Sequence, residues 1–228
     1  MENICYKIKI SHRVKRLALK ISSSQGLEVI VPPATPSTII KKFVHANRAF
    51  IVKHQHLIKA FEKPFIPPHT IKLHALNQSW NIIYANEATK QCNIKIFPEK
   101  ILLSKKNSSK SIFQKMMKIF LKKIAIEHLS PHLDQLSQQH QLPYQQLVYR
   151  VQRTRWGSCS CQKNITLNAA LLFMPIQTVH YVMIHELCHT KHFNHSKCFW
   201  TTLAQYMPNY AQHQKILKQP EQYLPDWF

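Results

Sequence analysis

The stretch VMIHELCHTKHFNHSKCFW, residues 182–200, decides how the sequence is interpreted, because it holds four of the chain's fifteen histidines. Within it, His185, Glu186 and His189 form the pattern H-E-x-x-H. On a helix, positions four apart lie on one face, so the two imidazoles can bind one metal ion. The glutamate beside the first histidine is then placed to take a proton from a water that the metal activates. The pattern therefore predicts a metal site with Glu186 as general base, and zinc suits it best, although another divalent metal would also fit.

A catalytic zinc site needs a third protein ligand, and His192 and His195 are the nearby candidates. On one continuous helix, His192 would extend the stripe over roughly 10 Å, at 1.5 Å per residue, and the three rings could not converge on one ion. The helix is therefore expected to end soon after His189. Asn194 tolerates left-handed turn geometry, which would bring His195 back as the third ligand and leave His192 on the connection.

The competing interpretation is a His-rich helix without a metal. The clusters HQH at 54–56 and HFNH at 192–195 show that histidines gather elsewhere in this chain. A glutamate within the apolar stretch VHYVMIHEL, residues 179–187, is less expected by chance, because buried glutamate is rare unless it is paired or functional. The metal site is therefore the favoured interpretation.

The composition is globular and strongly basic. Hydrophobic residues make up 45% of the 228 residues, and 31 Lys and Arg against 10 Asp and Glu give a formal charge of +21. Such a charge attracts polyanions such as nucleic acid, nucleotides or acidic lipid surfaces, although it is equally typical of a compositional habit of the source. No secretory signal or membrane span is predicted, so we expect a cytoplasmic protein with reduced cysteines.

Hydrophobic periodicity predicts an α+β protein. Its first part, residues 1–105, is strand-rich with one helix, and a loop-like stretch at 104–111 leads into a second domain, residues 106–228. Pro131 is expected to start a second helix or to kink the first. The predicted strands are within 4–31, 70–103, 146–153 and 165–173, and the predicted helices are 35–61, 112–141, from 176 or 178 to 189, and one capped by Ser196.

Several motifs together resemble the YgjP-like metallopeptidase family, a branch of the zincin metallohydrolases. RWGSCS (155–160), ITLN (165–168), HELCH (185–189) and NHSKCFW (194–200) follow in the family's order and spacing, and residues 11–54 resemble its opening strands and first helix. The resemblance implies a zincin-like catalytic domain with a small sheet packed on the HExxH helix. It also implies that RWGSC lies against that helix, that His185, His189 and His195 are ligands and that Glu186 is the base. Metzincins share the ligand spacing, but they place a glycine where this chain has His192.

The segment around RWGSC supplies further candidates. Gly157 is one of two glycines in the chain, which suggests a positive φ or a close approach to another group. Arg155 could pair with a substrate carboxylate or phosphate, or tether the helix from a buried position. Trp156 could line the cleft or belong to the core. Asn168 could bond a substrate backbone along an edge strand, or close a turn.

Three functions follow from these features. The first is peptide hydrolysis by a zinc-dependent metallopeptidase. The second, which the family resemblance also implies, is hydrolysis of a nucleoside triphosphate such as UTP to monophosphate and diphosphate. The third is a nucleic-acid-associated metalloprotein that uses its basic surface.

Overall fold

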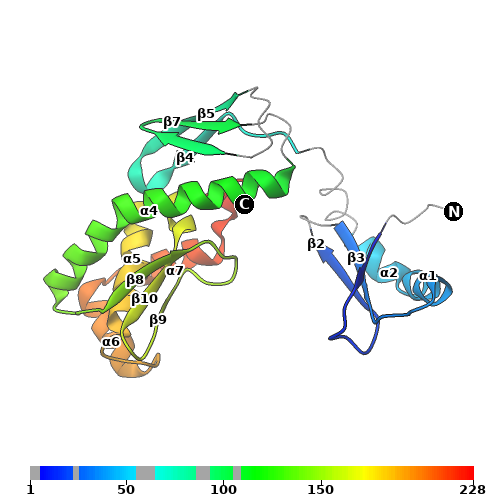
Figure 1. Ribbon diagram of the computed structural model, residues 1–228. Helices are drawn as coiled ribbons and strands as arrows, with labels where there is room; N and C mark the ends of the chain where they lie inside the picture. Colours follow the sequence, from blue (N-terminus) through cyan, green and yellow to red (C-terminus); the bar gives the residue numbers. More distant parts are fainter. Residues whose placement is uncertain (1–5, 23–25, 55–64, 86–92, 105–108) are drawn as a thin grey trace. The chain divides into compact units, whose positions relative to one another are not determined.

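The computed structural model describes residues 6–22, 26–54, 65–85, 93–104 and 109–228. The chain divides into two compact units, Met1–Ile66 and Pro67–Phe228 (Figure 1). This division differs from the boundary predicted near residue 105, because the sheet that precedes residue 105 shares its core with the helices that follow. Trp80 of that sheet packs edge-on against Phe120, with ring centroids 5.7 Å apart.

The first unit is a three-stranded sheet covered by two short helices. Its strands β1 (Lys7–Ile10), β2 (Ala18–Ser22) and β3 (Gly26–Val31) have the order β1-β3-β2, with β1 parallel and β2 antiparallel to β3. Helices α1 (Ser37–Ala46) and α2 (Arg48–Lys53) follow, and the core comprises Leu27, Val29, Val31, Ile40, Val44 and Ile51. The single helix predicted for 35–61 is thus broken at Asn47, whose side-chain amide donates to the Phe43 carbonyl at 2.8 Å; residues 55–61 lie outside the described residues.

The second unit begins with a four-stranded sheet. Strands β4 (Thr70–Leu73), β5 (Gln78–Ala85), β6 (Ile94–Phe97) and β7 (Lys100–Ser104) have the order β4-β5-β7-β6, and a short 3-10 helix, η1 (His74–Leu76), joins the first two. On β4 and β5 the buried side chains alternate with exposed ones, as expected for a sheet with one covered face.

One long helix, α4 (Lys110–His140), spans the second unit and continues through Pro131. The prediction of a helix at 112–141 is confirmed, and no second helix starts at Pro131. Proline removes one main-chain hydrogen bond from the helix, and Figure 1 shows α4 curving over its C-terminal part. The face of α4 that carries Met116, Met117, Phe120 and Leu121 is buried, whereas the lysines of the KMMKIFLKK segment are exposed.

A second three-stranded sheet precedes the helix that carries the H-E-x-x-H residues. Strands β8 (Gln146–Arg150), β9 (Gly157–Cys159) and β10 (Asn164–Asn168) have the order β8-β10-β9, with β8 parallel and β9 antiparallel to β10. Strand β10, which carries ITLN, is central in this sheet, and its neighbour β9 is an edge strand. The predicted strand 165–173 ends early, and residues Ala169–Phe173 form the 3-10 helix η2.

The remaining helices complete the second unit, and the α+β class predicted from the sequence is confirmed. Helix α5 (Ile176–Cys188) packs against α4, β9, β10, α6 (Lys197–Tyr206) and α7 (Tyr210–Lys218), and a 3-10 turn, η3 (Pro220–Gln222), follows. Within the described part of the chain, no helix combines the length and the apolar composition that a membrane crossing requires.

Candidate metal centre

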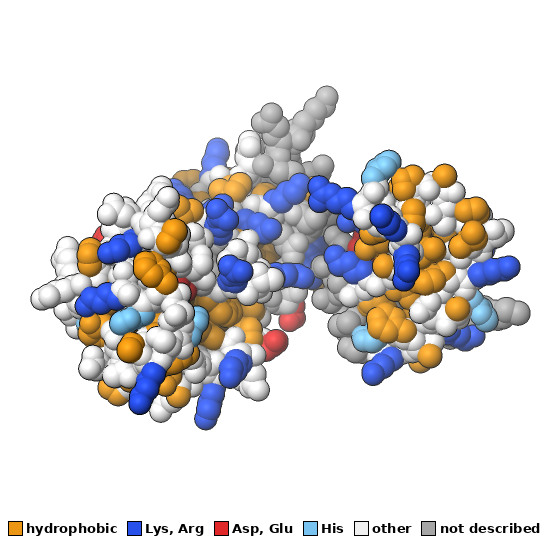
Figure 2. All heavy atoms as spheres, turned by 90° about the horizontal axis from the view of Figure 1, so that it is seen from below, with side chains coloured by type: hydrophobic (Ala, Val, Ile, Leu, Met, Phe, Trp, Pro, Cys, Tyr) orange, Lys and Arg blue, Asp and Glu red, His pale blue; other side chains and the backbone are white. Residues whose placement is uncertain are grey.

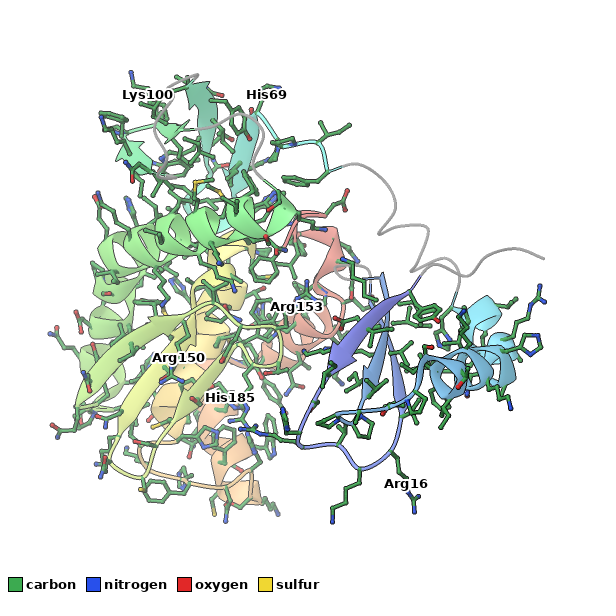
Figure 3. The ribbon with its side chains drawn as sticks, turned by 45° about the vertical axis from the view of Figure 1, so that its right-hand side comes forward. Arg16, His69, Lys100, Arg150, Arg153 and His185 are labelled. Atoms are coloured by element: carbon green, nitrogen blue, oxygen red, sulfur yellow. The ribbon has the colours of Figure 1, made fainter. Side chains whose placement is uncertain are left out.

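Helix α5 holds the H-E-x-x-H residues between the sheet β8-β10-β9 and helix α6. Pro175 occupies its N-cap position, and the helix ends with His189 as C-cap. Past this point the amides of Lys191 and His192 donate to the Cys188 carbonyl at 3.1 and 3.0 Å. Figure 3 labels His185 on this helix. The expected end of the helix just after His189 is confirmed, so His192 cannot extend the stripe of ligands.

The turn between α5 and α6 brings His195 to the two helical histidines. The Asn194 side-chain oxygen accepts the Ser196 amide at 3.2 Å, and α6 then begins at Lys197. His195 Nε2 lies 3.1 Å from His185 Nε2. One nitrogen from each of His185, His189 and His195 lies within 4.8 Å of the other two. The three rings predicted from the sequence therefore converge, as a single ion requires.

His192 faces away from this cluster. Its Nε2 lies 3.1 Å from the Thr202 hydroxyl, while its main-chain carbonyl accepts His189 Nδ1 at 2.9 Å. This second contact places a proton on His189 Nδ1 and leaves the Nε2 lone pair available to a metal. His192 thus orients a neighbouring ring through its backbone, and its own ring is directed elsewhere.

Two aromatic side chains of α6 pack around the histidines. The Phe199 ring is fully buried, and its centroid lies 4.9, 4.6 and 4.8 Å from those of His185, His189 and His195. Trp200 stacks on His195 with a centroid distance of 5.6 Å and an interplanar angle of 29°. Phe199 belongs to the core, whereas Trp200 is half-buried and forms one wall of the cluster.

The protonation of the cluster suits metal ligation. Burial, followed by the nearby His189 and His195, lowers the pKa of His185 to about 3. Burial also lowers the pKa of His189, against the opposing effect of its bond to the His192 carbonyl. Neutral imidazoles are the form that binds metal. Among the described residues, the buried atoms His185 Nδ1 and Glu186 Oε2 have no hydrogen-bond partner. Three imidazole donors beside a buried carboxylate fit a divalent cation such as zinc.

Glu186 and Gly157 are in direct contact, which explains why a glycine occupies position 157. A Cβ atom placed on Gly157 would lie 2.5 Å from Glu186 Oε1, 2.7 Å from Cγ and 2.8 Å from Cδ. Of the two reasons open for this glycine, the structure shows close approach; the other glycine, Gly26, has a φ of 72°. Glu186 is only 5% exposed, and burial raises the pKa of its carboxyl to about 8.

The edge strand β9 presents main-chain groups beside this carboxylate. The Asn168 amide donates to the Trp156 carbonyl at 2.8 Å, and the Ser160 amide donates to the Asn164 carbonyl at 3.0 Å. Bonded pairs alternate along an antiparallel ladder, so the amides and carbonyls of Gly157 and Cys159 point away from β10. Cys159 shares the strand face of Gly157, and burial, together with the charge of Glu186, raises the pKa of its thiol to about 11.

The other predicted site residues have structural contacts. Asn168 is buried; its side-chain nitrogen donates to the carbonyls of Gln152 and Arg155 at 2.7 and 2.8 Å, and its oxygen accepts the Ala170 amide at 3.1 Å. It therefore closes the loop between β8 and β9. Arg155 is exposed, so it is not the buried tether that was one of its two predicted roles. Trp156 is half-buried, and its indole N–H donates to the Leu217 carbonyl at 3.4 Å.

Two features of the site were not predicted from the sequence. Strand β9 has only three residues, too few to show an alternating pattern, so the sequence does not predict its edge beside Glu186. The sequence does not predict the stacking of Trp200 on His195 either. The i to i+4 spacing on a helix relates His185 to His189, but no comparable rule relates residues on different elements.

Comparisons with known proteins agree with this geometry. The family model described as a YgjP-like metallopeptidase domain matches residues 15–220. A search of curated proteins and a search of solved structures found no match.

Proposed function

Because the chain belongs to the YgjP-like metallopeptidase family, and is accordingly a metal-dependent hydrolase, we propose that it hydrolyses peptide bonds in a zinc-dependent reaction with Glu186 as the general base. The observation that carries the proposal is the position of Glu186. Its carboxylate is buried, one oxygen has no partner among the described residues, and the adjacent residue on the helix belongs to the three-histidine cluster.

The metal would be held by His185, His189 and His195. Zinc is the proposed ion because imidazole nitrogens suit it and because three protein ligands leave a position open for water or substrate. When bound, it supplies Lewis acidity, which polarises a substrate carbonyl and lowers the pKa of a water molecule. The remaining steps depend on residues of the chain itself.

Glu186 is the group that moves protons. Its carboxylate accepts a proton from the attacking water, the water oxygen bonds to the carbonyl carbon, and the same carboxyl group then donates the proton to the leaving amine nitrogen as the C–N bond breaks. Gly157 allows this cycle sterically, because any side chain at that position would overlap the carboxylate. Burial of the carboxyl favours its protonated form, and a neighbouring cation would favour the ionised form, so its proton affinity is adjustable through the cycle.

The edge of β9 would bind the substrate. An extended peptide can add to a strand edge through main-chain hydrogen bonds, and the outward-facing groups of Gly157 and Cys159 supply them. Because Gly157 touches Glu186, a peptide on this edge would have its main chain next to the catalytic carboxylate. This arrangement supports an unfolded or extended peptide as substrate, in preference to a small molecule.

The test compares two substrate panels with one preparation. Zinc-loaded protein is incubated with a peptide library and, separately, with nucleoside triphosphates including UTP, and cleaved peptides and diphosphate are quantified. We expect peptide cleavage that disappears in Glu186→Gln, with no diphosphate released. Diphosphate release without peptide cleavage would replace the proposal by a nucleotide pyrophosphatase, and activity that survives Glu186→Gln would remove Glu186 as the base.

A further inference from the structure

The net positive charge is densest in the first unit, where residues 1–66 carry +9, against +12 over the 162 residues of the second unit. Among residues 6–22 and 26–54, ten are Lys or Arg, and the one acidic residue is Glu28. Figure 2 shows many Lys and Arg side chains and few acidic side chains on the surface of each unit. Nothing in the proposed peptidase chemistry requires this concentration, because the metal ligands and Glu186 all belong to the second unit.

Strand register places three of these lysines on one face of the first sheet. Lys7 and Lys20 both pair with Glu28, and Lys9 pairs with Ile30. Paired residues share a face of the sheet, and neighbouring residues alternate between faces. The face opposite the helices therefore carries Lys7, Lys9 and Lys20, all exposed, around the buried Glu28. We call this surface the basic face; it is formed by Lys7, Lys9, Ala18, Lys20, Glu28 and Ile30.

The connection between β1 and β2 extends the basic face at one end of the sheet. It carries Arg13, Lys15 and Arg16, all of which are exposed. Its position is fixed by main-chain bonds, since the Ser11 amide donates to the Val31 carbonyl at 2.9 Å and its carbonyl accepts the Val14 amide at 3.4 Å. Figure 3 shows Arg16 extending outward from this connection. The cations are thus presented by an anchored sheet end and are not confined to one strand.

We propose that the basic face binds the sugar-phosphate backbone of a nucleic acid without reading its sequence. Lys7 and Lys9 lie about 6.6 Å apart along one strand, and Lys20 lies two strands away, about 10 Å across the sheet. A polyanion with closely spaced charges can contact all of them together. The basic face carries no aromatic side chain and no amide side chain that could stack on or hydrogen-bond to bases, so its contacts would be to phosphates.

A membrane surface is the less suitable partner for this face. Docking on anionic lipid combines cations with apolar side chains that enter the bilayer. Among the described residues of this unit, the large exposed apolar side chains are Ile8, Ile10, Ile39, Phe50, Val52 and Ile66. Ile39, Phe50 and Val52 belong to the helices on the opposite side, Ile8 and Ile10 point to the helix side of β1, and Ile66 lies outside the sheet. On the basic face, Ala18 is the only exposed apolar residue, and Ile30 is half-buried.

The test measures binding of the full chain to a labelled DNA duplex by fluorescence anisotropy over a range of salt concentrations. The main variant is Lys7→Gln, Lys9→Gln and Lys20→Gln; its matched control is Lys41→Gln, Lys42→Gln and Lys53→Gln, which removes three exposed charges from the helices. Each lost phosphate contact should reduce the slope of log K against log salt by about 0.9, so the main variant should lose about 2.7 and the control much less. Peptide cleavage should be unchanged in both variants.

Because Lys7 and Lys20 flank the buried Glu28, a second variant leaves them in place. Lys9→Gln with Arg16→Gln should reduce the slope by about 1.8, at about 0.9 per contact. Equal slope changes in the main variant and its control, an unchanged slope in the second variant, or preferential binding to vesicles containing phosphatidylserine would overturn the proposal.

Discussion

The two three-stranded sheets of this chain have the same topology and differ in what their side chains do. In both, the first strand is parallel and the second antiparallel to a central third strand, giving the orders β1-β3-β2 and β8-β10-β9. Each sheet contains one of the two glycines of the chain. A buried glutamate accompanies each sheet: Glu28 belongs to the first sheet, and Glu186 lies beside the second. The difference lies in the helix that follows and in the neighbour of each glutamate.

In the first sheet, Glu28 lies between Lys7 and Lys20, and the following helix carries no metal-ligand pair. In the second, Glu186 is carried by the following helix itself, next to His185 of the three-histidine cluster and against a glycine. The two units therefore share a strand topology, and they differ in whether a strand or the following helix supplies the buried carboxylate. Paired substitutions, one in each unit, test this difference.

The largest difference in peptide turnover should be between substitutions of the two buried glutamates. Glu186→Gln removes the proposed general base, so peptide turnover should fall by about 10² to 10⁴-fold while the metal content stays unchanged. Glu28→Gln should leave turnover at the wild-type level. Turnover and metal content are measured on the same preparations, and comparable losses in both variants would contradict the distinction between the sheets.

Substitutions of the two glycines, Gly157 and Gly26, should give the next largest difference in peptide turnover. Gly157→Ala inserts a methyl group within 2.5 Å of the Glu186 carboxylate, so the carboxylate must shift, and a shift of this size can reduce turnover by about 10²-fold. Gly26→Ala instead strains a residue with a φ of 72°, and it should lower the free energy of unfolding by about 1 to 2 kcal/mol without changing turnover. Turnover assays together with denaturant melts followed by circular dichroism separate the two effects; a Gly157→Ala enzyme with full activity would argue against the close contact.

An aromatic ring packs on a histidine in both units, Trp200 on His195 and Phe50 on His54, and of these two histidines only His195 is a proposed ligand. Trp200→Leu removes the ring stacked on His195, and loss of this support should weaken zinc binding about tenfold, the lower end for groups that orient a ligand. The matched variant Phe50→Leu removes the ring that lies 4.4 Å from His54 and should leave zinc affinity unchanged. Competition with a chromogenic chelator measures both, and equal affinities would show that Trp200 does not position His195.

The smallest effect concerns the dependence of stability on pH in the second unit. His180 Nε2 lies 3.2 Å from His132 Nδ1, and burial, then the charge of His132, lowers the pKa of His180. The unfolded chain therefore binds a proton first as the pH falls, so the free energy of unfolding should be level above about pH 6.5 and decrease below it. Urea melts followed by tryptophan fluorescence report on this unit, which contains all four tryptophans. His180→Gln should flatten the decrease, and an identical pH profile would contradict the assignment.

The parts of the structure that follow local rules could be predicted from the sequence. The position of His185 and His189 on one face and the end of α5 follow from helix geometry, and the long helix α4 follows from its apolar period. The division at residue 66 could not be predicted, because it depends on packing between Trp80 and Phe120, which are far apart in the sequence. The role of Gly157 stayed open for the same reason: the residue that fills its missing side-chain space belongs to another element.

We propose that three imidazoles, from His185, His189 and His195, hold one divalent cation. The zinc content of three proteins purified side by side tests this: the wild type, His195→Ala and His192→Ala. Each of the two variants removes one imidazole from the turn between α5 and α6. His192 contacts His189 through its main-chain carbonyl, which alanine retains. We expect one zinc per chain in the wild type and in His192→Ala, and loss of zinc in His195→Ala. Loss of zinc in His192→Ala with retention in His195→Ala would show that His195 is not the third ligand.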